Sequence, residues 1–250
     1  MRVLALIPAR MGSSRFPGKP MAPLLDRPMI GHVYDRVNSC PRVHTTAVAT
    51  CDEEIASYIT GLGGLAVNTS PDHERASDRC AEALRIVESQ HGTTFDVIVM
   101  VQGDEPMTHP EMIAEALDPF VQDDSVMVVN LLGAIESVED FMDPNCIKVV
   151  CDQMGNAIYF SRLPIPTSGL GNASMGKQVC VIPFRRDFLL DYSRMNPTPL
   201  EIAESIDMLR VLENGHKVRM VPTMHSSYAV DTPDDLQRVA RLMEEIGDNY

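Results

Sequence analysis

The sequence predicts an α/β fold in which helices flank a mostly parallel central sheet. Over the first half of the chain, short apolar runs of strand length alternate with segments whose apolar residues recur at helical spacing. Such an alternation favours parallel strands joined by right-handed crossovers. With 250 residues, 44% of them hydrophobic, the chain can bury the full core of one large domain.

The elements of the first half follow in order from these patterns. An unbroken apolar run predicts the first strand, and Pro8 ends it. Acidic residues at 52–54 favour a helix start, because negative charge is stabilising there, and Gly63-Gly64 ends that helix. The expected strands are 3–7, 45–50, 65–68, 96–101 and 126–132, and the expected helices are 29–37, 52–62, 80–87 and 110–120.

The alternation lapses in the second half. Strand-like runs on both sides of 152–156 predict a hairpin, and the segment 168–176, rich in Gly, Ser and Asn, predicts a mobile loop. Thr232 or Asp231 can cap a closing helix whose first turn contains Pro233. The expected strands are 148–151, 157–160, 178–184 and 218–221, and the expected helices are 200–212 and 233–243.

The composition excludes several classes of function. A formal net charge of −14 and a pI near 4.8 argue against nucleic acid as the main partner. The six cysteines include no Cys-x-x-Cys pair, so that neither a zinc ribbon nor a dithiol redox motif is indicated and free thiols are expected. No run approaches the roughly 18 apolar residues of a membrane span, which predicts a cytoplasmic protein without a membrane partner.

The segment that follows the first strand concentrates positive charge in an acidic chain. Its cations can fork around phosphate oxygens, and its glycines let the backbone turn sharply and come close to a ligand. Because α/β sheets bind ligands beyond the carboxyl ends of their strands, a polyphosphate site is expected here, with a solvated basic turn as the alternative. The residues concerned are Arg10, Gly12, Ser13, Ser14, Arg15, Gly18 and Lys19.

Two aspartates in distant parts of the sequence are candidate metal ligands. Asp104 follows the strand at 96–101, and Asp231 precedes the closing helix. If both face the cationic segment, their carboxylates could hold Mg²⁺, which takes one or two carboxylates together with phosphate oxygens and waters. The alternatives are a solvated turn acid for Asp104 and a helix cap for Asp231. Glu105 is the poorer candidate, because adjacent residues rarely point the same way.

Five motifs follow one another along nearly the whole chain. They are Pro8-Ala-Arg-Met-Gly-Ser-Ser-Arg-Phe-Pro-Gly-Lys-Pro20, Val101-Gln-Gly-Asp-Glu-Pro106, Tyr159-Phe-Ser-Arg162 followed by Ile165-Pro166, Leu209-Arg-Val-Leu212, and Val230-Asp-Thr-Pro-Asp-Asp-Leu236. In this order they resemble the motifs of the 3-deoxy-manno-octulosonate cytidylyltransferases, or CMP-Kdo synthetases. Other sugar nucleotidyltransferases share the first motif in looser form, but the five motifs together are a strong signal.

The resemblance implies a Rossmann-like nucleotidyltransferase, usually a homodimer, that joins the CMP of CTP to the anomeric oxygen of an eight-carbon acidic sugar and releases pyrophosphate, in lipopolysaccharide synthesis. It implies one domain with a nucleotide-binding half at 1–140, a smaller β-rich acceptor and dimerisation subregion at 141–228, and a closing metal loop and helix at 229–250.

Carried over position by position, the resemblance also implies site residues, with Mg²⁺ as the cofactor. The catalytic set is Arg10, Arg15, Lys19 and Asp104, and the metal ligands are Asp104 and Asp231. The nucleotide-binding set is Arg10, Met11, Gly12, Ser13, Ser14, Arg15, Lys19, Ser70, Arg75, Arg79 and Gln102. The acceptor-binding set is Arg75, Gln102, Gln178, Ile182 and Glu204.

The chain departs from the family at two of these segments. His73-Glu-Arg-Ala-Ser-Asp-Arg79 carries Arg75 and Ala76 in place of a Ser-Gly pair, and Gln178 and Ile182 replace a His and a Tyr. Because a polar site discriminates against analogues that leave its groups unmatched, we expect an acceptor other than ordinary Kdo, such as an amino-sugar variant or a phosphorylated or phosphonate acid. Drift within one specificity is the alternative.

Two rival functions remain open at this point. One is a nucleotidyltransferase that uses a sugar phosphate, although the closing Val-Asp-Thr-Pro segment favours the cytidylyl branch. The other is a catalytically silent nucleotide-binding subunit, against which the joint presence of the three cations and two aspartates counts.

Overall fold

The structure is a computed structural model that describes residues 1–13, 15–167 and 175–247. Its contacts divide the chain into two compact units, one formed by Met1–Ala114 with Ser227–Tyr250 and the other by Glu115–Ser226. The boundary falls inside helix α4 (Pro110–Gln122), and the end of the chain returns to the first unit. The expected assignment of 1–140, 141–228 and 229–250 to separate functions stays a prediction.

The first unit contains four parallel strands in the order β6-β1-β4-β5. They are β1 (Val3–Pro8), β4 (Thr45–Thr50), β5 (Leu65–Asn68) and β6 (Val97–Val101), and they confirm the expected bounds to within one residue. Leu4 pairs with Thr45 on one side and with Ile98 on the other, which makes β1 an inner strand. The carboxyl ends of β1 and β6, where the candidate residues follow, therefore share one edge of the sheet.

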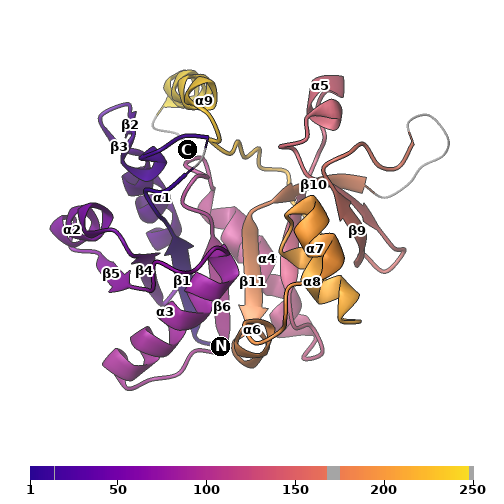
Figure 1. The fold of residues 1–250 in the computed structure, drawn as a ribbon, viewed down its shortest axis with the longest axis horizontal. Helices are drawn as coiled ribbons and strands as arrows, with labels where there is room; N and C mark the ends of the chain where they lie inside the picture. The colour runs from indigo at the N-terminus through magenta and orange to yellow at the C-terminus, as the bar shows by residue number, and fades with distance from the viewer. Residues whose placement is uncertain (14, 168–174, 248–250) are drawn as a thin grey trace. The chain divides into compact units, whose positions relative to one another are not determined.

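The helices of the first unit lie beside these strands or, in the case of the last helix, apart from them at the top of the view in Figure 1. They are α1 (Met29–Asn38), α2 (Glu53–Gly61), α3 (Ala76–His91), the beginning of α4, and α9 (Pro233–Ile246); a short 3₁₀ helix (Lys19–Met21) and the two-residue strands β2 (Pro23–Leu24) and β3 (Arg27–Pro28) precede α1. One buried cluster joins Val230 and Val239 to Leu24, Met29 and Met107, with Phe16 packed against it. This cluster fixes the closing helix against the region around the cationic segment.

The second unit contains a mixed sheet in the order β12-β7-β10-β8-β9. Its strands are β7 (Val129–Gly133), β8 (Lys148–Cys151), β9 (Ala157–Ser161), β10 (Met175–Val179) and β12 (Arg219–Pro222), with β11 (Val181–Arg185) bridged at Phe184 to Val128. β8 and β9 form the expected hairpin. β7 was expected to continue the parallel alternation, but it pairs antiparallel with β10 and parallel with β12. An apolar run indicates burial and not the identity of the neighbouring strand.

Two expected elements of the second unit are each divided. The strand expected at 178–184 is two strands, β10 and β11, and β10 begins within the expected loop, of which 168–174 lie outside the described residues. The helix expected at 200–212 is α7 (Pro199–Glu204) and α8 (Met208–Glu213), because Ser205 adopts a left-handed backbone at φ 54°. Ile202 is 63% exposed, and the expected common apolar face is absent from these two helices.

Three further features complete the fold. The short helices α5 (Val138–Met142) and α6 (Arg186–Tyr192) had no counterpart among the expected elements. All six cysteines are free, as expected. Within the described ranges, every helix is too short or too polar to cross a membrane.

Candidate functional site

The cationic bend, residues 10–19, closes on the backbone of Met11. The carbonyl of Met11 accepts hydrogen bonds from the amides of Ser13 and Gly18, both at 2.9 Å. Gly18 adopts φ +76°, a conformation that L side chains rarely take, so that glycine is required there. Gly12, for which the same freedom was expected, has no left-handed backbone and open space around its Cβ position. The bend is thus a closed loop, with Arg10 and Arg15 exposed on it.

The loop after β6 lies directly against the end of β1. A Cβ atom on Gly103 would stand 3.0 Å from the carbonyl oxygen of Pro8, so that a larger residue would push these two segments apart by a few tenths of an ångström. The carbonyl of Asp104 accepts a hydrogen bond from the amide of Val230 at 2.9 Å, and the Ser227 hydroxyl donates to the carboxylate of buried Glu105. Two hydrogen bonds therefore fasten the segment before α9 to the loop after β6, and the carboxylate of Glu105 has a structural role in this contact.

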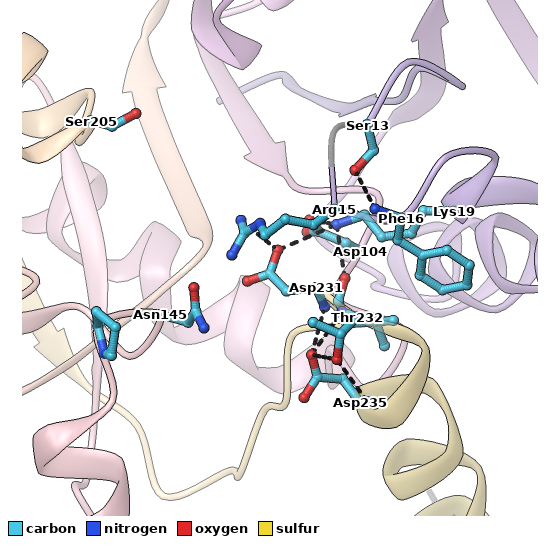
Figure 2. Close-up of polar contacts among 12 residues, drawn as sticks. Ser13, Arg15, Phe16, Lys19, Asp104, Asn145, Ser205, Asp231, Thr232 and Asp235 are labelled. Atoms are coloured by element: carbon cyan, nitrogen blue, oxygen red, sulfur yellow. Dashed lines mark hydrogen bonds and ion pairs between the residues drawn. The ribbon is translucent and has the colours of Figure 1, made fainter.

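The side chain of Lys19 lies where these three segments meet (Figure 2). Its ammonium donates to Asp104 Oδ2 at 2.6 Å and to the carbonyl of Val230 at 2.8 Å, and it lies 3.6 Å from Asp231 Oδ1. Arg15 approaches the same Asp231 oxygen at 3.0 Å. Two carboxylates from distant parts of the sequence thus converge on one cation.

The carboxylate of Asp231 is not the cap of α9. Thr232 occupies that position: its hydroxyl accepts from the amide of Asp235, whose carboxylate in turn accepts from the amide of Thr232 at 2.8 Å. This capping box satisfies the first amides of the helix and leaves the side chain of Asp231 directed at Lys19 and Arg15.

The arrangement fits a divalent cation. The side chains of Asp104 and Asp231 are 21% and 22% exposed, partly shielded yet open to an ion from solvent. Each carboxylate already forms an ion pair with a basic side chain, and this positive charge offsets the repulsion between the two partly buried carboxylates. Asp104 and Asp231 are therefore the residues that could hold Mg²⁺, with its remaining positions left to waters and phosphate oxygens.

A second polar cluster holds the loop before α3. The carboxylate of Glu82 accepts from the amide of Ser70 at 2.8 Å and lies 2.7 Å from Nε2 of His73. Burial raises the pKa of Glu82, but these hydrogen bonds outweigh it and leave the pKa below its usual value. Arg79, buried, and Arg10, exposed, both point a guanidinium nitrogen at the carbonyl of His73, each at 3.5 Å. The cluster therefore ties the loop to the start of the cationic bend.

The remaining predicted residues are less closely grouped. Arg75 precedes the first residue of α3 and is half-buried, as is Gln102 after β6; the Ser13 hydroxyl accepts from the amide of Phe16. Ser14 lies outside the described residues. These positions do not by themselves define a base pocket.

Three predicted acceptor residues belong to the second unit. The Gln178 amide donates to Oδ1 of buried Asn130 at 2.6 Å, and Ile182 is 2% exposed within the core. Glu204 accepts from the Ser161 hydroxyl at 3.1 Å and from the amide of Arg162 at 2.9 Å. Gln178 and Glu204 form hydrogen bonds, and Ile182 packs in the core, all within the second unit.

Sequence reasoning missed two carboxylates near the predicted site. Asp52 was interpreted only as the start of α2, and Glu82 was not singled out. Asp52 Oδ2 accepts a hydrogen bond from the amide of Met11 at 2.8 Å. Its place just after β4, a parallel neighbour of β1, was the available signal, because such strands end at the same edge.

Comparison with known proteins gives concordant findings. A family model described as cytidylyltransferase matches residues 4–218. A 3-deoxy-manno-octulosonate cytidylyltransferase of Geobacter metallireducens is 43% identical over 97% of this chain and 98% of its own, and one of Acaryochloris marina is 37% identical over 98% of both. The solved structure of a CMP:2-keto-3-deoxy-manno-octonic acid synthetase complexed with CTP superposes with a TM-score of 0.87 at 35% identity, covering 98% of this chain and 99% of that one.

The site geometry predicts competition between Lys19 and a divalent cation. Replacing Lys19→Met should destabilise the metal-free protein at neutral pH by about 1–3 kcal/mol, because two partly buried carboxylates lose their shared donor. Mg²⁺ should raise the Tm of this variant more than that of the wild type, since the ammonium no longer competes. Calorimetric Tm values with and without Mg²⁺ measure both effects.

The control for this prediction is Arg15→Met, which removes only the half-exposed partner of Asp231. It should respond to Mg²⁺ nearly as the wild type does. Equal Mg²⁺-induced shifts in the Lys19→Met variant and the wild type would contradict the shared-cation account.

Proposed function

We propose a reaction from the premise that the chain belongs to the cytidylyltransferase family: it transfers CMP from CTP to 3-deoxy-manno-octulosonate (Kdo) or a closely similar acidic sugar, with release of pyrophosphate. The observation that carries this proposal is the convergence of Lys19, Asp104 and Asp231, with Arg15 on the last of them. A magnesium-bound triphosphate needs basic side chains for its phosphates and carboxylates for its metal ion, and the bend and the two aspartates provide both.

The basic side chains of the bend can stabilise the negative charge that develops during the transfer. A hydroxyl oxygen of the acceptor loses its proton and bonds to the α-phosphorus of CTP while the bond from that phosphorus to the bridging oxygen of pyrophosphate breaks. Negative charge grows on the departing pyrophosphate, and Arg10, Arg15 and Lys19 can neutralise it from a backbone loop that is already closed. Held in this way, the triphosphate can present its α-phosphorus in line with the acceptor.

The proposed cofactor is Mg²⁺, held by Asp104 and Asp231. When bound, it would supply charge neutralisation at the phosphoryl oxygens and lower the pKa of an oxygen ligand. The chain's own contribution is to orient both carboxylates: the Val230 amide holds the loop of Asp104, and the capping box of α9 directs Asp231.

The identity of the acceptor is in question because this chain differs from the family at predicted acceptor-binding positions. Arg75 brings a guanidinium to a position just before α3, where the family has a small residue. Gln178 and Ile182 lack the imidazole and hydroxyl of the family, and here they contact Asn130 and the core of the second unit. An acid other than Kdo, such as an amino-sugar variant, a sugar phosphate or a phosphonate, is therefore the second candidate.

We also propose a homodimer in the cytoplasm, acting in lipopolysaccharide synthesis. Strand β9 lies at the edge of the mixed sheet and exposes 59% of Ile158, and Leu163 just after it is 69% exposed. Exposed apolar side chains on an edge strand favour association with a second chain. Only the beginning of this edge is already paired, through the bridge between Asn156 and Arg219 and the hydrogen bond from the Ala157 amide to the Val218 carbonyl, among the described residues.

Turnover tests the reaction directly. The purified chain with CTP, Mg²⁺ and Kdo should release pyrophosphate, and Asp104→Ala should lower kcat about a hundredfold or more, because a group beside the developing charge is lost. Asp96→Ala is the matched control: Asp96 stands at the opposite end of β6, is exposed, and should leave kcat unchanged.

An acceptor panel separates the candidates. Kdo, an amino-sugar variant of it and a phosphorylated sugar acid are compared by kcat/KM for pyrophosphate release. A wide preference for Kdo supports the first candidate and ends the hypothesis of a changed acceptor, whereas CTP binding without turnover of any acid would support the silent subunit.

The edge of β9 tests the dimer. Replacing Ile158→Asp should lower the molar mass in solution from that of two chains to that of one, measured by light scattering after size exclusion, because a charge at an apolar interface costs its desolvation. A wild-type chain that is monomeric, or a variant that stays dimeric, would contradict this assignment of the interface.

A further inference from the structure

The two ends of the cationic bend are held by a single peptide group. The Met11 carbonyl binds the amide of Ser13 near the start of the bend and that of Gly18 near its end. The nitrogen of Met11 donates to Oδ2 of Asp52 at 2.8 Å. One carboxylate therefore fixes the residue on which Arg10, Arg15 and Lys19 all depend for their starting positions.

The backbone of Asp52 is itself fixed by its neighbours. Its amide donates to the Thr50 hydroxyl at 3.1 Å, and its carbonyl accepts the first hydrogen bond of α2 from Ala56, also at 3.1 Å. Three residues earlier, the Ala49 carbonyl accepts from the amide of Ala9, which ties the end of β1 to β4. The carboxylate is thus presented to Met11 from a rigid strand end.

The side chain of Asp52 does not cap helix α2, although the residue stands at the N-cap position. It stands at the N-cap of α2, where a carboxylate ordinarily accepts from the first amides of the helix, but it makes no such hydrogen bond. Acidic residues of the first turn, Glu53 and Glu54, already complement the helix dipole. Its Oδ2 accepts instead from the Met11 amide at 2.8 Å and from the Cys51 thiol at 3.6 Å, and the shorter hydrogen bond to Met11 is the one that directs the carboxylate toward the bend.

We propose that Asp52 is a positioning residue of the nucleotide site. It fixes the peptide between Arg10 and Met11, directly before the Met11 carbonyl that closes the bend, so that the cations are preorganised for a triphosphate, and it does not itself touch the nucleotide. A charge-assisted hydrogen bond to an amide is well suited to this role. The inference rests on the proposed function, since it assumes that the bend binds the phosphates of CTP.

Charge and geometry predict opposite effects for this residue, which makes the proposal testable. A negative charge beside a triphosphate site repels the ligand, so that removing Asp52 would tighten CTP binding if charge alone mattered. If its hydrogen bond positions the bend, removal must weaken CTP binding. The sign of the change therefore distinguishes a positioning residue from a nearby charge.

Three substitutions of Asp52 separate the two effects. Asp52→Asn keeps an acceptor oxygen in place without the charge, Asp52→Glu keeps the charge but moves the acceptor by one methylene, and Asp52→Ala loses both. The control is Glu53→Ala, which removes an exposed charge from the same turn without contact to the bend. The readouts are the Kd for CTP by calorimetry, KM for CTP, kcat, and Tm as a check of folding.

In the Asp52→Ala and Asp52→Glu variants, the Kd and KM for CTP should rise about tenfold or more, with a smaller change in kcat. In the Asp52→Asn variant, the Kd should rise only a few-fold, and Glu53→Ala should leave CTP binding unchanged. Unchanged or tighter CTP binding in the Ala and Glu variants would overturn the proposal, as would an Asn variant as weak as Ala. Failure of the wild type to release pyrophosphate would count against the proposed function alone, because the Kd series still reports on Asp52.

Discussion

The ammonium of Lys19 is the interaction on which the candidate site depends. It binds Asp104 and the Val230 carbonyl and lies beside Asp231, groups that are 85 and more than 200 positions away in the sequence. Without a cation between them, two partly buried carboxylates would repel each other. Whatever occupies the site must therefore be positive, and a divalent metal with its triphosphate meets the same requirement as lysine does in its absence.

The scaffold makes this meeting possible through ordinary α/β architecture. Parallel strands β1 and β6 deliver their following loops to one edge, and Gly103 lets those loops come into contact. Asp231 arrives from the other end of the chain because α9 packs on the cluster around Met29 and Met107. Its direction is set by a capping box that uses Thr232 and Asp235 for the helix and leaves Asp231 to the site.

Much of this was predictable from the residues alone, and the failures have physical reasons. The four parallel strands and the approach of Lys19 to Asp104 follow from apolar runs with polar residues at their carboxyl ends. The approach of Asp231 was expected only as a condition and through the family resemblance, because its position depends on how α9 packs. The partners of β7 were not predictable, because burial on both faces carries no information about the neighbouring strand. The break at Ser205 was missed because the spacing of Ile206 and Leu209 continues the helical pattern of the preceding turn. The helix start at Asp52 was predicted correctly, but its contact with the bend was missed, because a carboxylate at that position can serve the helix or a neighbouring loop and the sequence does not show which.

The central claim is that the cationic bend and the two distant aspartates form one metal-nucleotide site. Crystals grown with CTP and Mn²⁺ test it most directly, because the anomalous scattering of Mn²⁺ locates the ion independently of the protein phases. The account predicts an anomalous peak within bonding distance of carboxylate oxygens of both Asp104 and Asp231 and of a phosphate oxygen of CTP, with Lys19 moved from the carboxylates toward the phosphates. A peak elsewhere, or CTP bound away from the bend, would contradict it.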